Sequence, residues 1–125
     1  MDTILTPTEI FDFRAELSDY PQALAALDVI EDCEGDLEDA AIALAIQVGQ
    51  QPTTSEGWIT SLAKRWRPRL CEAELRADLA DNQVASTITQ LVTTKALPWE
   101  LATLVSIYAT KFGIDDFCKP LEEKL

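Results

Sequence analysis

Pairs of carboxylates three residues apart are the commonest arrangement in this chain that could support chemistry. They occur at Glu9 and Asp12, at Glu16 and Asp19, and at Glu31 and Glu34. Residues three apart share one face of a helix, and carboxylate oxygens suit Mg²⁺, as in all-helical nucleotide pyrophosphatases. With 22 acidic residues in 125, however, such pairs arise readily by chance. A Mg²⁺-dependent all-α nucleotide pyrophosphatase is therefore an alternative and not the main prediction.

The chain contains no histidine. This excludes Ser-His and Cys-His activation of a nucleophile, histidine-held zinc or haem, and Glu-x-x-His di-iron centres. A calcium loop does not fit either, because placing Gly35 at its glycine position puts Ile30 first and Ala41 twelfth. We predict no catalytic residue, no metal ligand and no cofactor, and hence a protein that is not an enzyme. The sequence leaves open whether the acidic stretch 31–39 binds a cation.

The three cysteines, Cys33, Cys71 and Cys118, are odd in number, widely spaced and without a CxxC pair. This spacing favours neither a disulfide framework nor a zinc ribbon. We predict that they are small buried hydrophobic residues in a reducing compartment. Cys71 follows two arginines that could lower its pKa, but it lies on an apolar stripe and no base accompanies it.

Charge is unevenly placed along the chain, whose net charge is −12. Residues 1–56 hold thirteen acids and a single base, Arg14. The acids at 36, 38 and 39 begin a helix, where the helix dipole favours them. Glu31, Asp32 and Glu34 fall at the end of the preceding helix, where the dipole disfavours them. Solvent, a basic segment of the same fold or a partner must therefore compensate these three carboxylates.

The basic counterpart is the segment 64–76, which holds five of the ten bases. Four of them, Lys64, Arg65, Arg67 and Arg69, fall within six residues around Trp66. Arginines interleaved with tryptophan can grip phosphates and stack on bases, so contact with nucleic acid is a second alternative. It is not expected, because the acidic chain would repel nucleic acid over most of its surface. We predict that the segment meets acidic residues of the same fold, a second copy or a partner.

Apolar residues recur at helical spacing through most of the chain, which predicts an all-α fold. A Thr cap, Pro and Glu at residues 6–9 mark one helix start, and Pro21, Asp36, Ser55 and Pro98 mark others. The helix after Asp36 is apolar all round and is expected at the centre of the core. Pro68 is expected to break or restart a helix, and Pro120 to distort the last one. Residues 84–94 fit a helix, or a short strand because of their β-branched run.

The length and composition favour a single helical domain over residues 1–125, a compact bundle of six to eight short helices. No apolar run reaches the roughly 20 residues that a membrane span needs, the longest being residues 40–46. The acidic N-terminal residues do not resemble a signal peptide. We predict a cytoplasmic protein without membrane contact.

These patterns predict a small acidic protein-interaction module, a regulator or adaptor without catalytic activity. Its partner is another protein or a second copy, which would make a homodimer. The binding residues are predicted to be Lys64, Arg65, Arg67, Arg69, Glu31, Asp32, Glu34 and Trp99. Trp99, after Pro98 at a helix start, fits equally a surface anchor or a pin between helices. A sharper variant, an acidic decoy for nucleic-acid-binding sites, requires an acidic face with no base within it.

Overall fold

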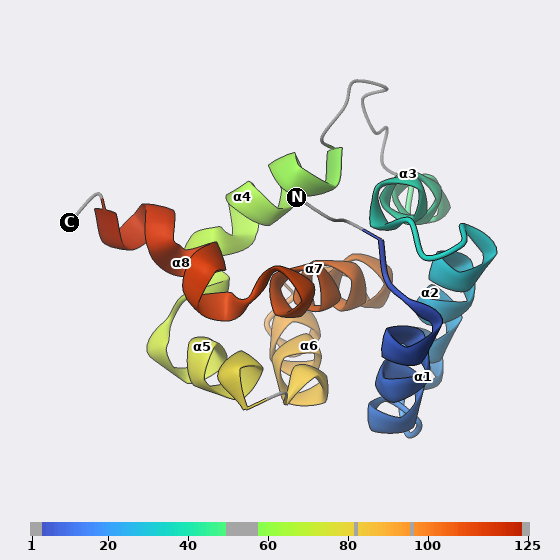
Figure 1. Ribbon diagram of the computed structural model, residues 1–125, viewed down its shortest axis with the longest axis horizontal. Helices are drawn as coiled ribbons and strands as arrows, with labels where there is room; N and C mark the ends of the chain where they lie inside the picture. The colour runs from blue at the N-terminus through green and yellow to red at the C-terminus, as the bar shows by residue number, and fades with distance from the viewer. Residues whose placement is uncertain (1–3, 50–57, 82, 96, 124–125) are drawn as a thin grey trace.

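The computed structural model describes residues 4–49, 58–81, 83–95 and 97–123, and most of these residues are helical (Figure 1). These residues form eight helices and no strand, which confirms the predicted all-α class. The helices are α1 (Pro7–Glu16), α2 (Pro21–Asp32), α3 (Leu37–Gln47), α4 (Trp58–Leu70), α5 (Ala73–Ala80), α6 (Val84–Thr93), α7 (Trp99–Phe112) and α8 (Ile114–Glu123). Within this described part, no helix is long and apolar enough to cross a membrane.

The start of α1 is built as predicted from its sequence. The Thr6 hydroxyl accepts from the Glu9 N–H at 3.1 Å, and the Glu9 carboxylate accepts from the Thr6 N–H at 2.9 Å. This reciprocal capping box satisfies two backbone donors that the first turn leaves free. Leu5 and Ile10, which flank the cap at the positions of a hydrophobic staple, are both buried. The chain therefore enters α1 from a fixed direction.

The centre of the core is α7, and not the helix after Asp36 as its apolar composition predicted. All residues of α7 from 101 to 109 are buried, and α7 lies in the middle of the bundle in Figure 1. The α3 helix does pack inward, but Ile46 in its last turn is 63% exposed. Small alanines make α3 apolar all round, whereas α7 carries the larger side chains that fill a core from every side.

Pro68 does not break the fourth helix, because α4 runs through it to Leu70. The predicted start of this helix at Ser55 lies outside the described residues.

Residues 84–93 form α6, so the strand alternative for this segment is wrong. Here burial of Val84, Ile88 and Leu91 along one helical face outweighs the weak helix propensity of the β-branched residues. Pro120 lies inside α8, which runs through it to Glu123.

Two of the cysteines form a disulfide, so the prediction that all three are unpaired core residues is wrong. Cys71 follows α4, Cys118 lies in α8, and their Cα atoms are 5.7 Å apart. Because the two cysteines are 47 positions apart in the sequence, no local spacing could indicate the pair. Cys33 is a free thiol and is half-buried.

The helices around α7 fall into two groups (Figure 1). On one side lie α1, α2 and α3, and on the other lie α4, α5 and α8, with α6 packed along α7. The first group comes from the acidic part of the chain and the second contains the basic segment. The charge segregation along the sequence therefore becomes a segregation in space.

Candidate functional site

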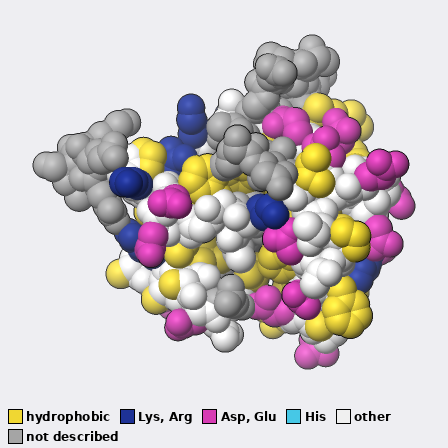
Figure 2. Space-filling model, in the orientation of Figure 1, with side chains coloured by type: hydrophobic (Ala, Val, Ile, Leu, Met, Phe, Trp, Pro, Cys, Tyr) yellow, Lys and Arg dark blue, Asp and Glu magenta, His cyan; other side chains and the backbone are white. Residues whose placement is uncertain are grey.

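Most of the net charge of the protein lies in and between its first group of helices, where the described residues 4–49 hold eleven acids and one base. Residues 57–125 contain nine acids and nine bases, so the imbalance of −12 arises entirely within residues 1–56. Figure 2 shows the acidic side chains crowded on the side formed by α1–α3, with basic side chains more frequent near α4 and α8. All three large hydrophobic side chains that are exposed in the described residues also belong to this first group: Ile4 (49%), Phe11 (70%) and Ile46 (63%).

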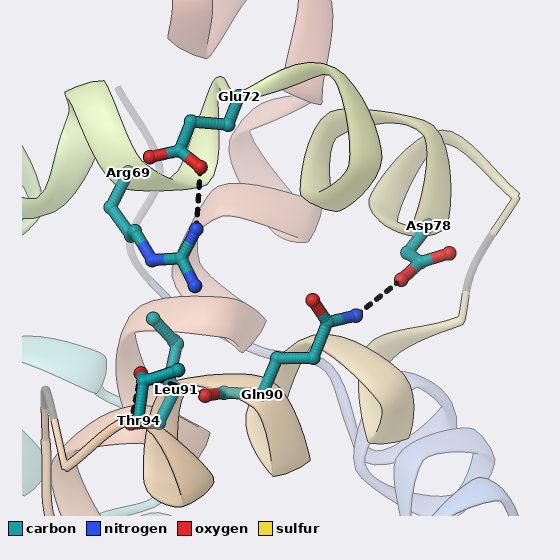
Figure 3. A network of polar contacts seen from close by, with 6 residues as sticks. All are labelled: Arg69, Glu72, Asp78, Gln90, Leu91 and Thr94. Carbon is teal, nitrogen blue, oxygen red and sulfur yellow. Dashed lines mark hydrogen bonds and ion pairs between the residues drawn. The ribbon is translucent and has the colours of Figure 1, made fainter.

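Two of the predicted basic binding residues are already engaged within the fold. Arg69 pairs with Glu72 three residues later (Figure 3). The guanidinium of Arg67 lies 4.9 Å from the centre of the Phe117 ring and is half-buried there. Lys64 and Arg65 are exposed and make no hydrogen bond or ion pair to any described residue. Of the four cations, Lys64 and Arg65 are thus the two without a contact to a charged or aromatic group of the described residues.

Other polar groups in the second half hold its helices together. Arg76 of α5 pairs with Asp115 of α8 at 3.1 Å. Asp78 of α5 accepts a hydrogen bond from Gln90 at 3.1 Å (Figure 3) and another from Ser86 at 2.9 Å, and both donors are on α6. These contacts join α5 to its neighbours in the half of the chain, residues 57–125, whose acids and bases balance.

On the acidic side, Arg14 compensates one of the three carboxylates that the sequence singled out. Its guanidinium lies 2.9 Å from both Asp28 and Glu31, between α1 and α2. Hydrogen bonds to these two carboxylates raise the pKa of Arg14 further above its ordinary value. Glu31 is therefore used by the fold. A base now lies within the acidic face, which is the arrangement that the decoy variant excluded.

The turn between α2 and α3 has an unusual backbone. The Gly35 N–H donates to the Ile30 carbonyl at 2.8 Å, and the Glu34 N–H donates to the Glu31 carbonyl at 2.9 Å. These two bonds form a Schellman motif, whose left-handed position normally takes glycine. Here that position holds Glu34, with φ of 58°. The carboxylate at the end of α2 therefore sits on a backbone conformation that is sterically unfavourable for a residue with a side chain.

The N-terminal segment crosses this turn and fixes it. The Leu5 N–H donates to the Gly35 carbonyl at 2.8 Å, and Ile4 forms an isolated antiparallel bridge with Asp36. A Cβ atom on Gly35 would lie 2.3 Å from the Leu5 carbonyl oxygen, so only glycine permits this approach. Residues 4–5 and 30–39 thus form one rigid corner.

A hollow of about 360 Å³ lies at this corner. It is lined by Ile4, Asp32, Cys33, Glu34, Asp36 and Asp39. The carboxylates of Asp32, Glu34 and Asp39 are exposed and make no hydrogen bond or ion pair with the described residues. By contrast, the Asp36 carboxylate accepts from the N–H groups of residues 38 and 39 and caps α3. Three carboxylates that the fold does not use therefore surround one hollow, with the exposed Ile4 side chain at its edge.

A second, more apolar hollow of about 400 Å³ lies beside the first. Its lining consists of Leu5, Pro7, Ile10, Glu31, Glu34 and Gly35. Glu34 lines both hollows, and the N-terminal segment supplies Ile4 to one and Leu5 to the other. We call residues 4–10 and 31–39 together the acidic corner. It offers anionic groups and apolar surface side by side, which is what a basic, partly apolar peptide requires.

The thiol of Cys33 in this corner is unsuited to nucleophilic chemistry. Burial raises its pKa, and the neighbouring charges of Asp39, Asp32 and Asp36 raise it further. The thiol therefore stays protonated at neutral pH, and the protonated form is a poor nucleophile and metal ligand. Its surroundings are opposite to the electropositive ones that activate cysteines.

The carboxylates of α1 approach α7 in another cleft, of about 370 Å³. It is lined by Glu9, Asp12, Phe13, Glu16, Thr110 and Lys111. Glu9 pairs with Lys111 at 2.8 Å, and Glu16 accepts from the Val84 N–H at 2.9 Å. Among the described residues, no group of three or more carboxylate, thiol or imidazole side chains could hold a metal ion. The cleft therefore lacks the carboxylate cluster that the pyrophosphatase alternative needs.

Trp99 packs at the start of α7. It is half-buried against the core, and its ring centre lies 6.1 Å from that of Tyr20, at the start of α2. This contact joins the N-terminal ends of the two helices and leaves part of the Trp99 side chain exposed.

The sequence did not indicate Ile4 or Asp39 as site residues. Asp39 lies in the first turn of α3, where the helix dipole alone accounts for a negative charge, so its sequence position gave no reason to expect a binding role. Ile4 reaches the corner only because residues 4–5 cross Gly35. A conserved glycine among relatives could have signalled the crossing, but a single sequence carries no such information.

Comparisons of the chain with protein-family models, curated proteins and solved structures find no match. The function must therefore be argued from the acidic corner and the charges themselves.

Proposed function

We propose that this protein is a protein-interaction module without catalytic activity, whose acidic corner receives a basic, partly apolar segment of another protein. One observation carries the proposal. The carboxylates of Asp32, Glu34 and Asp39 surround a hollow without any partner among the described residues, whereas the carboxylates around them cap helices or form ion pairs. A lysine or arginine of a partner supplies the missing positive charge.

The rigid backbone of the corner supports this proposal. The Schellman turn and the crossing of Leu5 over Gly35 fix the positions of the carboxylates before any partner arrives. A preformed site avoids part of the entropy that binding otherwise consumes. The strongly negative surface around the corner also attracts a basic partner over a distance and accelerates encounter.

The test compares two triple variants that remove the same charge from different places. One is Asp32→Asn/Glu34→Gln/Asp39→Asn in the corner, and the control is Glu74→Gln/Asp81→Asn/Asp116→Asn, three exposed carboxylates of the other half. Each tagged protein is used to capture partners from nuclease-treated lysate, and the captured proteins are quantified by mass spectrometry. We expect a basic protein to bind the wild type and the control but not the corner variant.

Equal capture by both variants would rule out the corner as the binding site. Loss of every partner on nuclease treatment would instead favour contact with nucleic acid. Capture of only the protein itself, lost in the corner variant, would identify a second copy as the partner.

The predicted cytoplasmic location rests in part on three unpaired cysteines. The disulfide removes that support, because disulfides persist mainly in oxidising compartments. Alkylating free thiols in intact cells and then measuring the mass of the protein tests the location directly. One alkylated cysteine indicates an oxidising compartment, and three indicate a reducing one.

A further inference from the structure

A groove of about 560 Å³ runs between α4 and α8, remote in sequence from the acidic corner. Its lining is Lys64, Arg67 and Pro68 from α4, and Pro120 and Leu121 from α8. Lys64, Arg67 and Pro68 are three and four residues apart, so they share one face of α4. The groove therefore combines two cations with an apolar floor.

Neither cation of this groove is neutralised by a carboxylate of the described residues, a property that they share with Arg65, Lys95 and Lys119. Four bases form ion pairs with carboxylates: Arg14, Arg69, Arg76 and Lys111. Lys64 and Arg67 form none with any described residue. The Arg67 Nε is moreover buried and has no hydrogen-bond acceptor. A buried donor without an acceptor destabilises a fold, and since a ligand cannot reach this buried atom, a bound carboxylate pairs with the terminal nitrogens of the guanidinium instead.

Neighbouring residues hold Arg67 in place for such a ligand. The fully buried Phe117 of α8 lies beneath its guanidinium, at 4.9 Å from the ring centre. The Cys71–Cys118 disulfide, one residue further along α8, ties the end of α4 to the same helix. Both walls of the groove are thus fixed, and the planar guanidinium is oriented before a ligand binds.

We infer that this groove binds an acidic segment of a partner protein, with carboxylates on Lys64 and Arg67 and an apolar side chain on the proline and leucine floor. Guanidinium and carboxylate form short, charge-assisted hydrogen bonds, often two at once. Nucleic acid fits less well, because Arg67 already covers the Phe117 ring, which is buried and so cannot stack on a base. The groove is a second docking surface, of opposite charge to the acidic corner.

The test uses ¹⁵N-labelled full-length protein and a short synthetic peptide in which two glutamates flank a leucine. The Nε–Hε signal of Arg67, assigned by its absence from Arg67→Gln, is followed together with the backbone amides during titration. We expect saturable shifts of this signal and of the amides of Lys64 and Leu121. Lys64→Gln/Arg67→Gln should bind roughly tenfold more weakly, while Lys95→Gln, which removes an unpaired cation outside the groove, should bind normally.

Three results would overturn the inference. The first is no shift at about 1 mM peptide, which corresponds to negligible affinity. The second is equal binding by the double variant and by Lys95→Gln while circular dichroism shows both folded. The third is tighter binding of a single-stranded oligothymidylate than of the peptide. The triple variant of the acidic corner should bind the acidic peptide at least as well as the wild type. A failure of the groove proposal can therefore be distinguished from a failure of the proposed function.

Discussion

At the scale of single residues, Glu34 has a left-handed backbone conformation that should lower the stability of the protein, while its carboxylate serves the proposed function. A side chain at φ of 58° crowds its own backbone, whereas glycine does not. Glu34→Gly should therefore raise the free energy of unfolding by about 1 kcal/mol. The same substitution should also lower the affinity for the partner at the acidic corner, because one of the three unpaired carboxylates is lost. Urea denaturation and partner titration measure the two effects.

Lys95 offers a matched control for this prediction. It has φ of 60° after α6, in the equivalent position of its turn. Lys95→Gly should give a similar gain in stability and leave partner binding unchanged. If Glu34→Gly instead bound the partner as well as the wild type, the carboxylate would not belong to the binding site.

Two carboxylates of α1 should respond to pH in opposite directions. Burial tends to raise the pKa of Glu9, but hydrogen bonds from Lys111 and Thr6 outweigh it and lower the pKa below its ordinary value. The ionised carboxylate therefore stabilises the fold above about pH 4.3, and this contribution is lost as the pH falls through the lowered pKa. Glu9→Gln keeps the capping box but should cost about 0.5–1 kcal/mol at neutral pH and nothing in acid.

For Glu16, burial raises the pKa and outweighs the hydrogen bond from Val84. Its ionised form therefore opposes folding at neutral pH, and protonation relieves this as the pH falls through the raised pKa. Glu16→Gln, whose amide oxygen can still accept from Val84, should be at least as stable as the wild type at pH 7. Denaturation curves across pH measure both variants. A difference between Glu9→Gln and the wild type that does not change with pH would contradict the ionic origin of the Glu9 contribution.

At the scale of helices, the disulfide has the largest expected effect on stability. It closes a loop of 47 residues that includes α5, α6 and α7. The chain-entropy model gives such a cross-link about 4 kcal/mol, because the unfolded chain without it is freer. Cys71→Ser/Cys118→Ser should therefore unfold at a much lower urea concentration than the wild type. Cys33→Ser, which leaves the cross-link intact, should shift the midpoint far less, and equal shifts for both variants would argue against the pairing.

The helices show which features a single sequence can predict. Local signals located helix starts correctly at Thr6, Pro21 and Asp36, because a cap or a proline acts within one turn. Relations between distant segments were not predictable. The disulfide, the bridging of α1 and α2 by Arg14, and the central place of α7 all depend on packing that no periodicity records. The carboxylates Asp32 and Glu34 were found because helix electrostatics left them unexplained, whereas Ile4 required the crossing at Gly35.

At the scale of the whole molecule, charge segregation opposes the stability of the protein while it favours binding. Eleven acids and one base lie within the described residues 4–49, and their mutual repulsion destabilises the compact state. Salt screens this repulsion, since the Debye length falls from about 30 Å at 0.01 M to about 8 Å at 0.15 M. The ion pairs also weaken, but exposed pairs contribute little each.

The thermal midpoint should therefore rise with salt over this range, by about 4 °C if screening contributes on the order of 1 kcal/mol. Partner affinity at the acidic corner should fall over the same range, because attraction between opposite charges is screened equally. The corner variant Asp32→Asn/Glu34→Gln/Asp39→Asn should start with a higher midpoint and respond less to salt. The control variant of the balanced half should behave more like the wild type. A midpoint that falls with salt would mean that ion pairs outweigh repulsion, and that the acidic side is already compensated within the fold.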